Sequence, residues 1–325
     1  MIDSILSASG ASVVVIAPHP DDESLATGGL IQAALAHGAR VTVVLLTDGD
    51  NNPWPQRAVE HRIWIGSRER ERWGRRRRAE AHAALDILGV SDESIRYLGL
   101  PDLGLTRRLT TDTAATVRAL CGALRDADPT IVISPSLADL HPDHSAAHIM
   151  SCLALAAARV RAKLLSYTIH GPTREPQLEC VLDQRARERK SRAVGAHQTQ
   201  LVLSRKRIRA HAQRPERFAI EAPCGGAVMS PVQQLPWRIG QVSTALTEIV
   251  LIANNRVWFL GIERQRSVVE TGDTPRCVRD SDGRLSLQLP EQLDIASPAF
   301  VKLAIRVSSP WIYDRWGWVR LGASK

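Results

Sequence analysis

Two short segments rich in histidine and aspartate carry the residue types that bind metal ions and move protons. Residues 19–23 read His-Pro-Asp-Asp-Glu, and residues 139–144 read Asp-Leu-His-Pro-Asp-His. Each follows a short run, 13–18 or 130–134, of the kind that forms a buried strand. Together they can supply histidine and aspartate ligands for one divalent ion and leave other carboxylates for proton transfer. Three protein ligands with one open position are what a catalytic zinc requires.

The simpler interpretation is that both segments are ordinary turns. Proline fixes φ and aspartate caps the helix that follows, so a single His-Pro-Asp sequence can serve local structure alone. Two such segments, each directly after a predicted buried strand, favour a functional site instead.

Strands and helices alternate over about the first 170 residues, and this order determines where the two segments lie. The predicted strands are 13–18, 41–47, 95–99, 130–134 and 163–169. The predicted helices are 24–37, 68–88, 113–125, 144–161 and 182–196. The alternation indicates βαβ units, and hence an α/β fold with a Rossmann-like, mostly parallel sheet and helices on both faces. Ligand sites in such sheets form at the carboxyl ends of strands, so we expect both segments to open onto one crevice.

The sequence changes character beyond about residue 215. Five of the eight tryptophans lie from Trp237 onward. Short runs bounded by turn residues, which are typical of β-rich structure, lie at 256–260, 285–289 and 301–307. We therefore expect a first domain over residues 1–215 and a smaller β-rich accessory region over residues 216–325.

Two groups of residues outside the paired segments can bind a ligand or serve structure alone. Aromatic residues near the C-terminus can stack on a sugar, fill a core or form a subunit interface; they are Trp311, Tyr313, Trp316 and Trp318. Arginine-rich stretches can hold an anionic substrate or form solvated helix faces paired with glutamates; they lie at 68–78, 185–192 and 205–209. Of the remaining histidines, His170 and His211 are interpreted as surface or core residues.

The two segments resemble the LmbE/PIG-L family of zinc-dependent N-deacetylases. The resemblance rests on PHPDDESLATGG at residues 18–29 and HPDH at residues 141–144, and covers about residues 11–200. Further matches, in the same order along the chain, are RRAEA at 77–81, LGLPD at 98–102 and AHQTQ at 196–200. Members of this family remove acetyl groups from N-acetylglucosamine-containing conjugates and related amides.

The resemblance implies a metal centre and its base. His19, Asp22 and His144 would be the ligands of Zn²⁺, although such a donor set also accepts other divalent ions. Asp21 would be the general base, which takes a proton from the attacking water. Zinc lowers the pKa of bound water to about 7 and polarises the amide carbonyl, and a general base adds roughly 10²–10⁴-fold in rate.

The resemblance also implies roles for residues around the metal. His141 would stabilise the oxyanion or protonate the leaving amine, with the Asp143 carboxylate orienting the imidazole and keeping it protonated. Arg77 and Asp102 would contact the substrate.

Composition limits the other possibilities. The chain has 325 residues, a net charge of +8 and a pI of about 9.7, a balance that favours anionic partners. The five cysteines are scattered without a CxxC pair, which argues against a disulfide framework and fits a reducing cytosol. No apolar stretch reaches the roughly 18 residues that a membrane helix needs. We therefore expect a cytoplasmic enzyme acting on a small-molecule or glycoconjugate substrate that can be anionic, rather than a nucleic-acid-binding or membrane-spanning protein.

The leading hypothesis is a metal-dependent hydrolase that removes an acetyl group from the amide nitrogen of an N-acetylglucosamine-containing or related sugar conjugate. A second hypothesis keeps the site and changes the substrate to a non-sugar amide of secondary metabolism. A third is a polyanion-binding protein whose metal site is vestigial.

Overall fold

The structure is a computed structural model, and it describes most of the chain. The described residues are 2–7, 10–171, 176–224, 230–240, 247–264, 273–290, 298–305, 313–314 and 316–322. None of the helices within these ranges combines the length and the apolar character that crossing a membrane would need.

A seven-stranded sheet forms the centre of the first domain, with the strand order β3-β2-β1-β4-β5-β7-β6. Its strands are β1 (Ser12–Ala17), β2 (Arg40–Thr47), β3 (Ile95–Leu100), β4 (Ile131–Pro135), β5 (Lys163–Tyr167), β6 (Leu178–Cys180) and β7 (Glu216–Ile220). Strands β1 to β5 pair in parallel, while β7 is antiparallel to both β5 and β6. The prediction of a mostly parallel, Rossmann-like α/β sheet is therefore confirmed.

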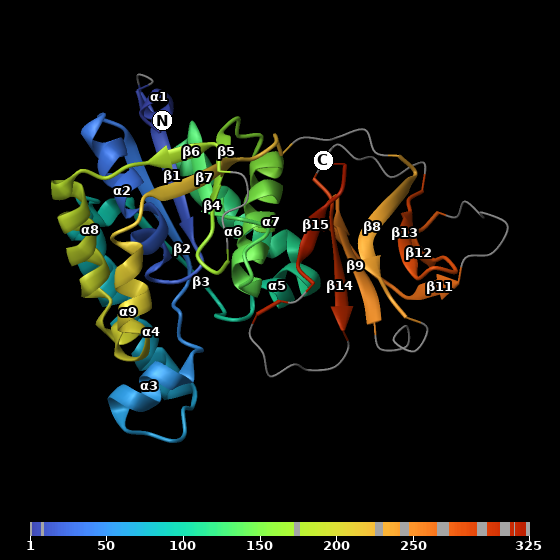
Figure 1. Ribbon diagram of the computed structural model, residues 1–325, viewed down its shortest axis with the longest axis horizontal. Helices are drawn as coiled ribbons and strands as arrows, with labels where there is room; N and C mark the ends of the chain where they lie inside the picture. Colours follow the sequence, from blue (N-terminus) through green and yellow to red (C-terminus); the bar gives the residue numbers. More distant parts are fainter. Residues whose placement is uncertain are drawn as a thin grey trace.

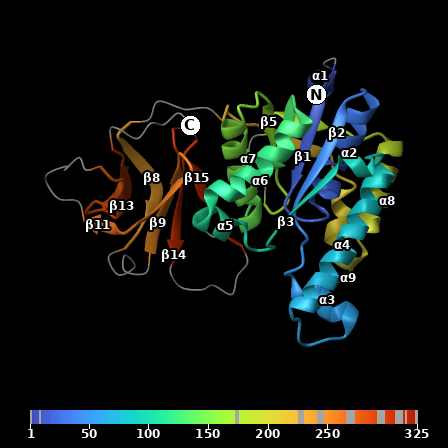
Figure 2. The ribbon, with the colours of Figure 1, turned by 180° about the vertical axis from the view of Figure 1, so that it is seen from behind.

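Helices cover both faces of this sheet (Figures 1 and 2). They are α1 (Asp3–Leu6), α2 (Asp22–Ala36), α3 (Pro53–Glu60), α4 (Ser67–Leu88), α5 (Leu105–Thr111), α6 (Thr113–Ala127), α7 (Pro142–Ala158), α8 (Gln184–Ala196) and α9 (Gln198–His211), with a 3-10 turn η1 (Asp92–Ser94). Alternation along β1 explains the two layers: Val13 and Val15 pack into the core under α2 and α4, whereas Val14 and Ile16 pack into the core under α6 and α7. Because the β-branched strand residues are buried on both sides, the sheet is held rigidly between its helices.

The strand order reverses between β1 and β4, which lie side by side at the centre of the sheet. The segment 19–23 leaves the end of β1 and enters α2, and the segment 139–144 leaves β4 and enters α7. Crevices at such reversal points are where open α/β sheets bind ligands, because neighbouring loops diverge there. The fold thus brings together two segments that are 120 positions apart along the chain, counting from residue 19 to residue 139.

The C-terminal region is built from two four-stranded sheets, β10-β9-β14-β15 and β11-β12-β13-β8. The strands are β8 (Val232–Arg238), β9 (Thr247–Ala253), β10 (Arg256–Leu260), β11 (Ile262–Arg264), β12 (Arg276–Arg279), β13 (Arg284–Gln288), β14 (Phe300–Ile305) and β15 (Trp318–Arg320). Residues of both sheets, such as Leu251 and Leu287, share one core. On the other side of β9, Val250 and Ile252 join Phe300 and Trp318 in the core beneath α6 and α7. The sheet β10-β9-β14-β15 therefore packs directly on the helical layer, and β14 and β15 lie beside α5 and α7 in Figure 1.

The predicted boundary at residues 215 and 216 falls directly before β7, which pairs with β5 and β6 in the first sheet. We propose that the first domain extends through Ile220 and that the C-terminal region begins between β7 and β8. Of the aromatic cluster, Trp318 is buried in the core between the two regions, and Trp311 lies outside the described residues.

Candidate functional site

The turn after β1 holds Asp21 in an unusual backbone conformation. Asp21 has φ 142° and ψ −27°, a region that costs a non-glycine residue about 1–3 kcal/mol and is typical of functional sites. The buried carboxylate of Glu23 accepts a hydrogen bond from the Asp21 backbone N–H at 3.0 Å. Glu23 is in turn 3.2 Å from the buried His197 Nε2. The conformation of Asp21 is thus fixed by a buried carboxylate and its histidine partner.

The turn after β4 is organised by Asp139, which the sequence analysis did not single out. Its Oδ2 accepts hydrogen bonds from the backbone N–H groups of Ile169 at 2.8 Å and His170 at 3.1 Å, and lies 3.1 Å from His144 Nδ1. Its Oδ1 accepts from the His141 N–H at 2.9 Å. One buried carboxylate therefore ties the start of α7 to the loop that follows β5.

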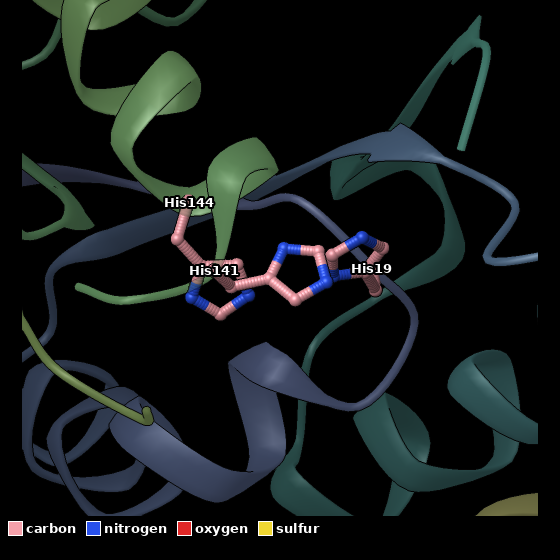
Figure 3. Close-up of side chains that lie close together, drawn as sticks. All are labelled: His19, His141 and His144. Atoms are coloured by element: carbon pink, nitrogen blue, oxygen red, sulfur yellow. The ribbon is translucent and has the colours of Figure 1, made fainter. Parts of the chain in front are cut away.

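The three predicted metal ligands converge on one oxygen atom. His19 Nδ1 is 3.2 Å and His144 Nε2 is 3.3 Å from Asp22 Oδ2. In Figure 3 the His19 ring, from the turn after β1, lies beside the rings of His141 and His144 from the start of α7. The centroids of His19 and His141 are 4.8 Å apart, and those of His141 and His144 are 5.0 Å apart. The structure thus places both predicted segments around one point.

The donor atoms suit a divalent cation. His144 Nε2 is buried and has no aligned hydrogen bond to any described residue, although Asp22 Oδ2 lies 3.3 Å away. Buried imidazole nitrogens without aligned partners are available to a metal ion. Besides the predicted set, His19 belongs to two overlapping groups of potential ligands, one with His141 and His144 and one with Asp102 and Asp143, each with donor atoms within 4.8 Å of one another.

In each of the two histidines predicted as ligands, a carboxylate also lies beside the second ring nitrogen. When His19 offers Nδ1 beside Asp22, its Nε2 remains 3.2 Å from Asp102 Oδ1. His144 offers Nε2 and keeps Nδ1 3.1 Å from Asp139 Oδ2. Such partners orient metal-binding imidazoles and raise their basicity. Burial alone would lower the pKa of both histidines, but the neighbouring aspartates raise it well above its usual value in His19 and to about 9 in His144.

The contacts of His141 and Asp143 differ from those expected, and their roles stay predictions. The Asp143 carboxylate accepts from the backbone N–H groups of Leu103 at 2.7 Å and Leu105 at 3.0 Å, and it lies 3.5 Å from His19 Nε2. It therefore fixes the loop before α5 and faces His19, instead of orienting the His141 ring. Burial, followed by the charges of nearby histidines, lowers the pKa of His141 far below its usual value, which favours a neutral imidazole over the protonated one expected.

Arg77 and Asp102, which were expected to bind substrate, mainly support other site residues. The buried Arg77 guanidinium donates to the carbonyls of Gly49 at 2.7 Å and Pro20 at 2.6 Å, and its Nη2 lies 3.4 Å from Asp21 Oδ1. Asp102 accepts from the backbone N–H of Asn51 at 2.7 Å and faces His19. Both also line the cavity described below, so contact with a substrate stays a prediction.

Asp21 faces the same space as the histidines. Burial raises the pKa of its carboxyl to about 6, although the nearby Arg77 guanidinium acts in the opposite direction. A carboxylate with a pKa in this range can both accept and return a proton near neutral pH.

A cavity of about 280 Å³ opens above these groups. His19, Asp21, Asp22 and His141 line it, together with residues from several other parts of the chain. These residues include Asn52 and Trp54 near α3, Ile169 and His170 after β5, Gln200 and Arg207 on α9, and Tyr313 in the C-terminal region. His170, which the sequence favours as a surface or core residue, also lies at the site: its ring is 5.4 Å from that of His141 and 5.1 Å from that of His144.

The arginine-rich stretch at 68–78 mostly forms ion pairs along exposed helix faces. Arg72 pairs with Glu60 at 2.5 Å and Arg75 with Glu71 at 2.6 Å, and such exposed pairs contribute only about 0–1 kcal/mol. This arrangement favours the solvated-face interpretation over a polyanion-binding surface.

The cations on and around α9 lie closer to the cavity. His211 lines it as well, and its pKa is lowered to about 4 by burial first and then by the charges of Lys190, Arg214 and Arg207. Arg207 of α9 lines the cavity too, and its positive charge leaves an anionic substrate open.

Residues 14–155 match the family described as GlcNAc-PI de-N-acetylase, or PIG-L. This part of the chain is therefore similar to the PIG-L family. The match contains both segments at the centre of the site, so the resemblance expected from residues 18–29 and 141–144 is confirmed. Both segments lie at the reversal point of the sheet, between β1 and β4.

The chain is also similar in sequence to curated deacetylases. A 1D-myo-inositol 2-acetamido-2-deoxy-alpha-D-glucopyranoside deacetylase from Mycolicibacterium smegmatis is 33% identical over 159 residues, which cover 43% of this chain and 51% of that protein. A protein of the same name from Rhodococcus erythropolis is 32% identical over 174 residues, covering 48% of this chain and 57% of that protein. The chain thus spans about half the length of the curated relatives that it matches.

Solved structures support the fold. The crystal structure of a conserved protein from Thermus thermophilus is 28% identical, covers 71% of this chain and 100% of its own, and has a TM-score of 0.52. An N,N'-diacetylchitobiose deacetylase from Pyrococcus horikoshii has a TM-score of 0.52 at 21% identity, covering 66% of this chain and 84% of its own. A 4-carboxy-2-hydroxymuconate hydratase from Pseudomonas putida has a TM-score of 0.50 at 21% identity, covering 63% and 83%. Because a hydratase shares the PIG-L fold, the reaction has to be inferred from the site itself.

Proposed function

We propose that this protein is a metal-dependent deacetylase that removes the acetyl group from the amide nitrogen of an N-acetylglucosamine-containing or related sugar conjugate. The observation that carries the proposal is the convergence of His19 and His144 on the Asp22 carboxylate, beside Asp21 and below a cavity. The family of residues 14–155 and the sugar deacetylases among the relatives give further support.

His19, Asp22 and His144 would hold the ion, and zinc is the ion that a site of two histidines and one carboxylate suits best. Among the overlapping donor groups, this set contains a carboxylate and leaves the outward nitrogens of both imidazoles beside Asp102 and Asp139. Such an ion, when bound, supplies Lewis acidity that polarises an amide carbonyl and acidifies water.

Asp21 would be the general base. Its carboxylate lines the cavity next to the proposed ligands, and the strained turn held by Glu23 fixes its position. Asp21 accepts a proton from the attacking water and can return that proton to the leaving amine. The Arg77 guanidinium, 3.4 Å away, keeps the carboxylate oriented between these two steps.

His141 would bind the developing oxyanion as a neutral donor. Its Nδ1 accepts a hydrogen bond from the Asp143 backbone N–H at 3.2 Å. A neutral imidazole has one accepting and one donating nitrogen, so Nε2 carries the proton. His141 lines the cavity, and a donor fixed before the reaction stabilises negative charge that develops on the amide oxygen.

The test is acetate release from N-acetylglucosamine, N,N'-diacetylchitobiose and an N-acetylglucosaminyl inositol, with and without a chelator. We expect activity that a chelator abolishes, that added zinc restores, and that Asp21→Asn removes. A panel of non-sugar acetamides run beside the sugars separates the second hypothesis, since the same groups would cleave any amide that fits the cavity. Release that is indifferent to chelation and to Asp21→Asn would contradict the proposal.

A further inference from the structure

Among the described residues of the C-terminal region, the aromatic side chain of Tyr313 reaches the proposed active site. Tyr313 lines the cavity together with His141 and His170. Its ring centroid is 5.5 Å from that of His170, and its hydroxyl is 3.4 Å from His170 Nδ1. The region expected to be an accessory thus forms part of the substrate cavity of the PIG-L domain.

Backbone contacts hold this side chain in place from the side of the first domain. The N–H of Asp314 donates to the carbonyl of Leu140 at 2.9 Å, and the N–H of Leu140 donates to the carbonyl of His170 at 3.0 Å. Leu140 directly precedes His141 in the sequence. The backbone beside Tyr313 is therefore linked to the same turn that presents the proposed oxyanion donor.

The Asp314 side chain fixes the segment from the other side. Its carboxylate accepts from the N–H groups of Trp316 and Gly317, each at 3.2 Å, and it pairs with the largely buried Lys302 of β14. Hydrogen bonds to a charged group contribute about 1.5–3 kcal/mol each. With anchors in both domains, Tyr313 occupies a defined position at the cavity.

Tyr313 nevertheless keeps much of its ring uncovered. It is 46% exposed, while its hydroxyl lies against His170. An aromatic ring that is apolar on its face and polar at its tip is suited to pack on a ligand at the mouth of a pocket. Trp54, which is 62% exposed, lines the same cavity from α3.

We propose that Tyr313 is a substrate-binding residue, whose ring packs on the sugar that carries the acetamido group, and that the C-terminal region thereby sets substrate preference. This inference rests on the proposed function for the class of ligand. Tyr313 acts on binding and not on the bonds that change, because Asp21 and His141 supply the proton transfer and the oxyanion donor.

The experiment uses the full chain and measures binding separately from turnover. Isothermal titration calorimetry with N-acetylglucosamine and N,N'-diacetylchitobiose gives the Kd, and acetate release gives KM and kcat. We expect Tyr313→Ala to raise Kd and KM about tenfold, equivalent to ~1.4 kcal/mol, with a smaller effect on kcat. Tyr313→Phe keeps the ring and should stay within about threefold of the wild type, since the lost hydroxyl contacts His170 and not the sugar.

Phe259→Ala is the matched control, because this aromatic ring on β10 is 55% exposed and is not among the residues that line the cavity. Tyr313→Leu, which keeps an apolar side chain, replaces the alanine variant if the latter has a lowered unfolding midpoint. Unchanged Kd and KM in Tyr313→Ala, or in Tyr313→Leu where that variant replaces it, overturn the inference and leave the proposed function standing. Tyr313-dependent binding without acetate release overturns the reaction and keeps the inference, and a wild-type protein that neither binds nor cleaves these sugars overturns both.

Discussion

Asp139 offers the sharpest test of how the site is held together, and the change to make is Asp139→Asn. In the wild type, Oδ2 faces three donors, the N–H groups of Ile169 and His170 and the Nδ1 of His144, while Oδ1 accepts from His141. An asparagine can keep its oxygen at the Oδ2 position only by turning its NH₂ toward the His141 N–H. One buried donor then loses its acceptor, which costs about 1–3 kcal/mol.

The effect on metal binding follows from the lost charge. Without the carboxylate, His144 loses the partner that orients its ring and raises its basicity, and the loss of such a partner lowers metal affinity about 10- to 100-fold. The assay is competition for zinc between the protein and a chelator of known affinity, with urea unfolding run in parallel. Asp86→Asn, on the exposed face of α4, is the control and should match the wild type. An Asp139→Asn protein with wild-type zinc affinity would refute the role assigned to Asp139.

Three further outcomes are expected. Asp21→Asn should lower kcat about 10²–10⁴-fold in acetate release while zinc affinity in the same competition assay stays within twofold, and a large loss of zinc would instead make Asp21 a ligand. Lys190→Ala removes the cation 2.6 Å from Glu216 Oε1 in a fully buried pair, so the free energy of unfolding in urea should fall by about 3–5 kcal/mol, and a fall below ~1 kcal/mol contradicts the burial of that pair. Burial and nearby cations lower the pKa of His211 from 6.5 to about 4 in the folded state, so the unfolded state binds more protons between these pH values. The free energy of unfolding should therefore fall as the pH drops from 6.5 toward 4, and His211→Asn should reduce that fall. An identical pH dependence in the variant and the wild type would contradict the lowered pKa.

The central strands could be predicted because each is a run of consecutive, mostly apolar residues. Runs such as 13–18 and 41–47 are apolar on both sides of the chain, as strands covered by helices on two faces must be. The helix α9 was missed because it carries many cations and a non-helical break at Ser204, so it shows no continuous apolar face. Its stability comes from Leu201 and Ile208, which pack with Leu25 against α8. Two apolar residues that depend on such long-range packing give no helical periodicity in the sequence.

Some residues of the site can likewise be predicted from short motifs, whereas others depend on contacts between distant parts of the chain. His19, Asp22 and His144 could be placed from short motifs after predicted strands, because strand order alone brings those loops together. Asp139 and His170 could not, since their roles depend on the loop after β5 folding back onto the start of α7. The signal that could have found Asp139 is its position in the same six-residue segment as His144, five residues before that ligand. Tyr313 depends on how the C-terminal sheets dock, which no motif in its own segment records.

The number of buried carboxylates at the site argues against interpreting residues 19–23 and 139–144 as ordinary turns. Five aspartates are buried around one point, namely Asp21, Asp22, Asp102, Asp139 and Asp143. Burying that much negative charge is costly unless cations or hydrogen-bond donors compensate it. Backbone N–H groups donate hydrogen bonds to some of these carboxylates, and Arg77 lies beside Asp21. The imidazoles of His19 and His144 lie beside the others. A divalent ion between His19 and His144 would compensate the remaining charge, so the arrangement that gives the proposed chemistry is also the one in which the ion stabilises the fold.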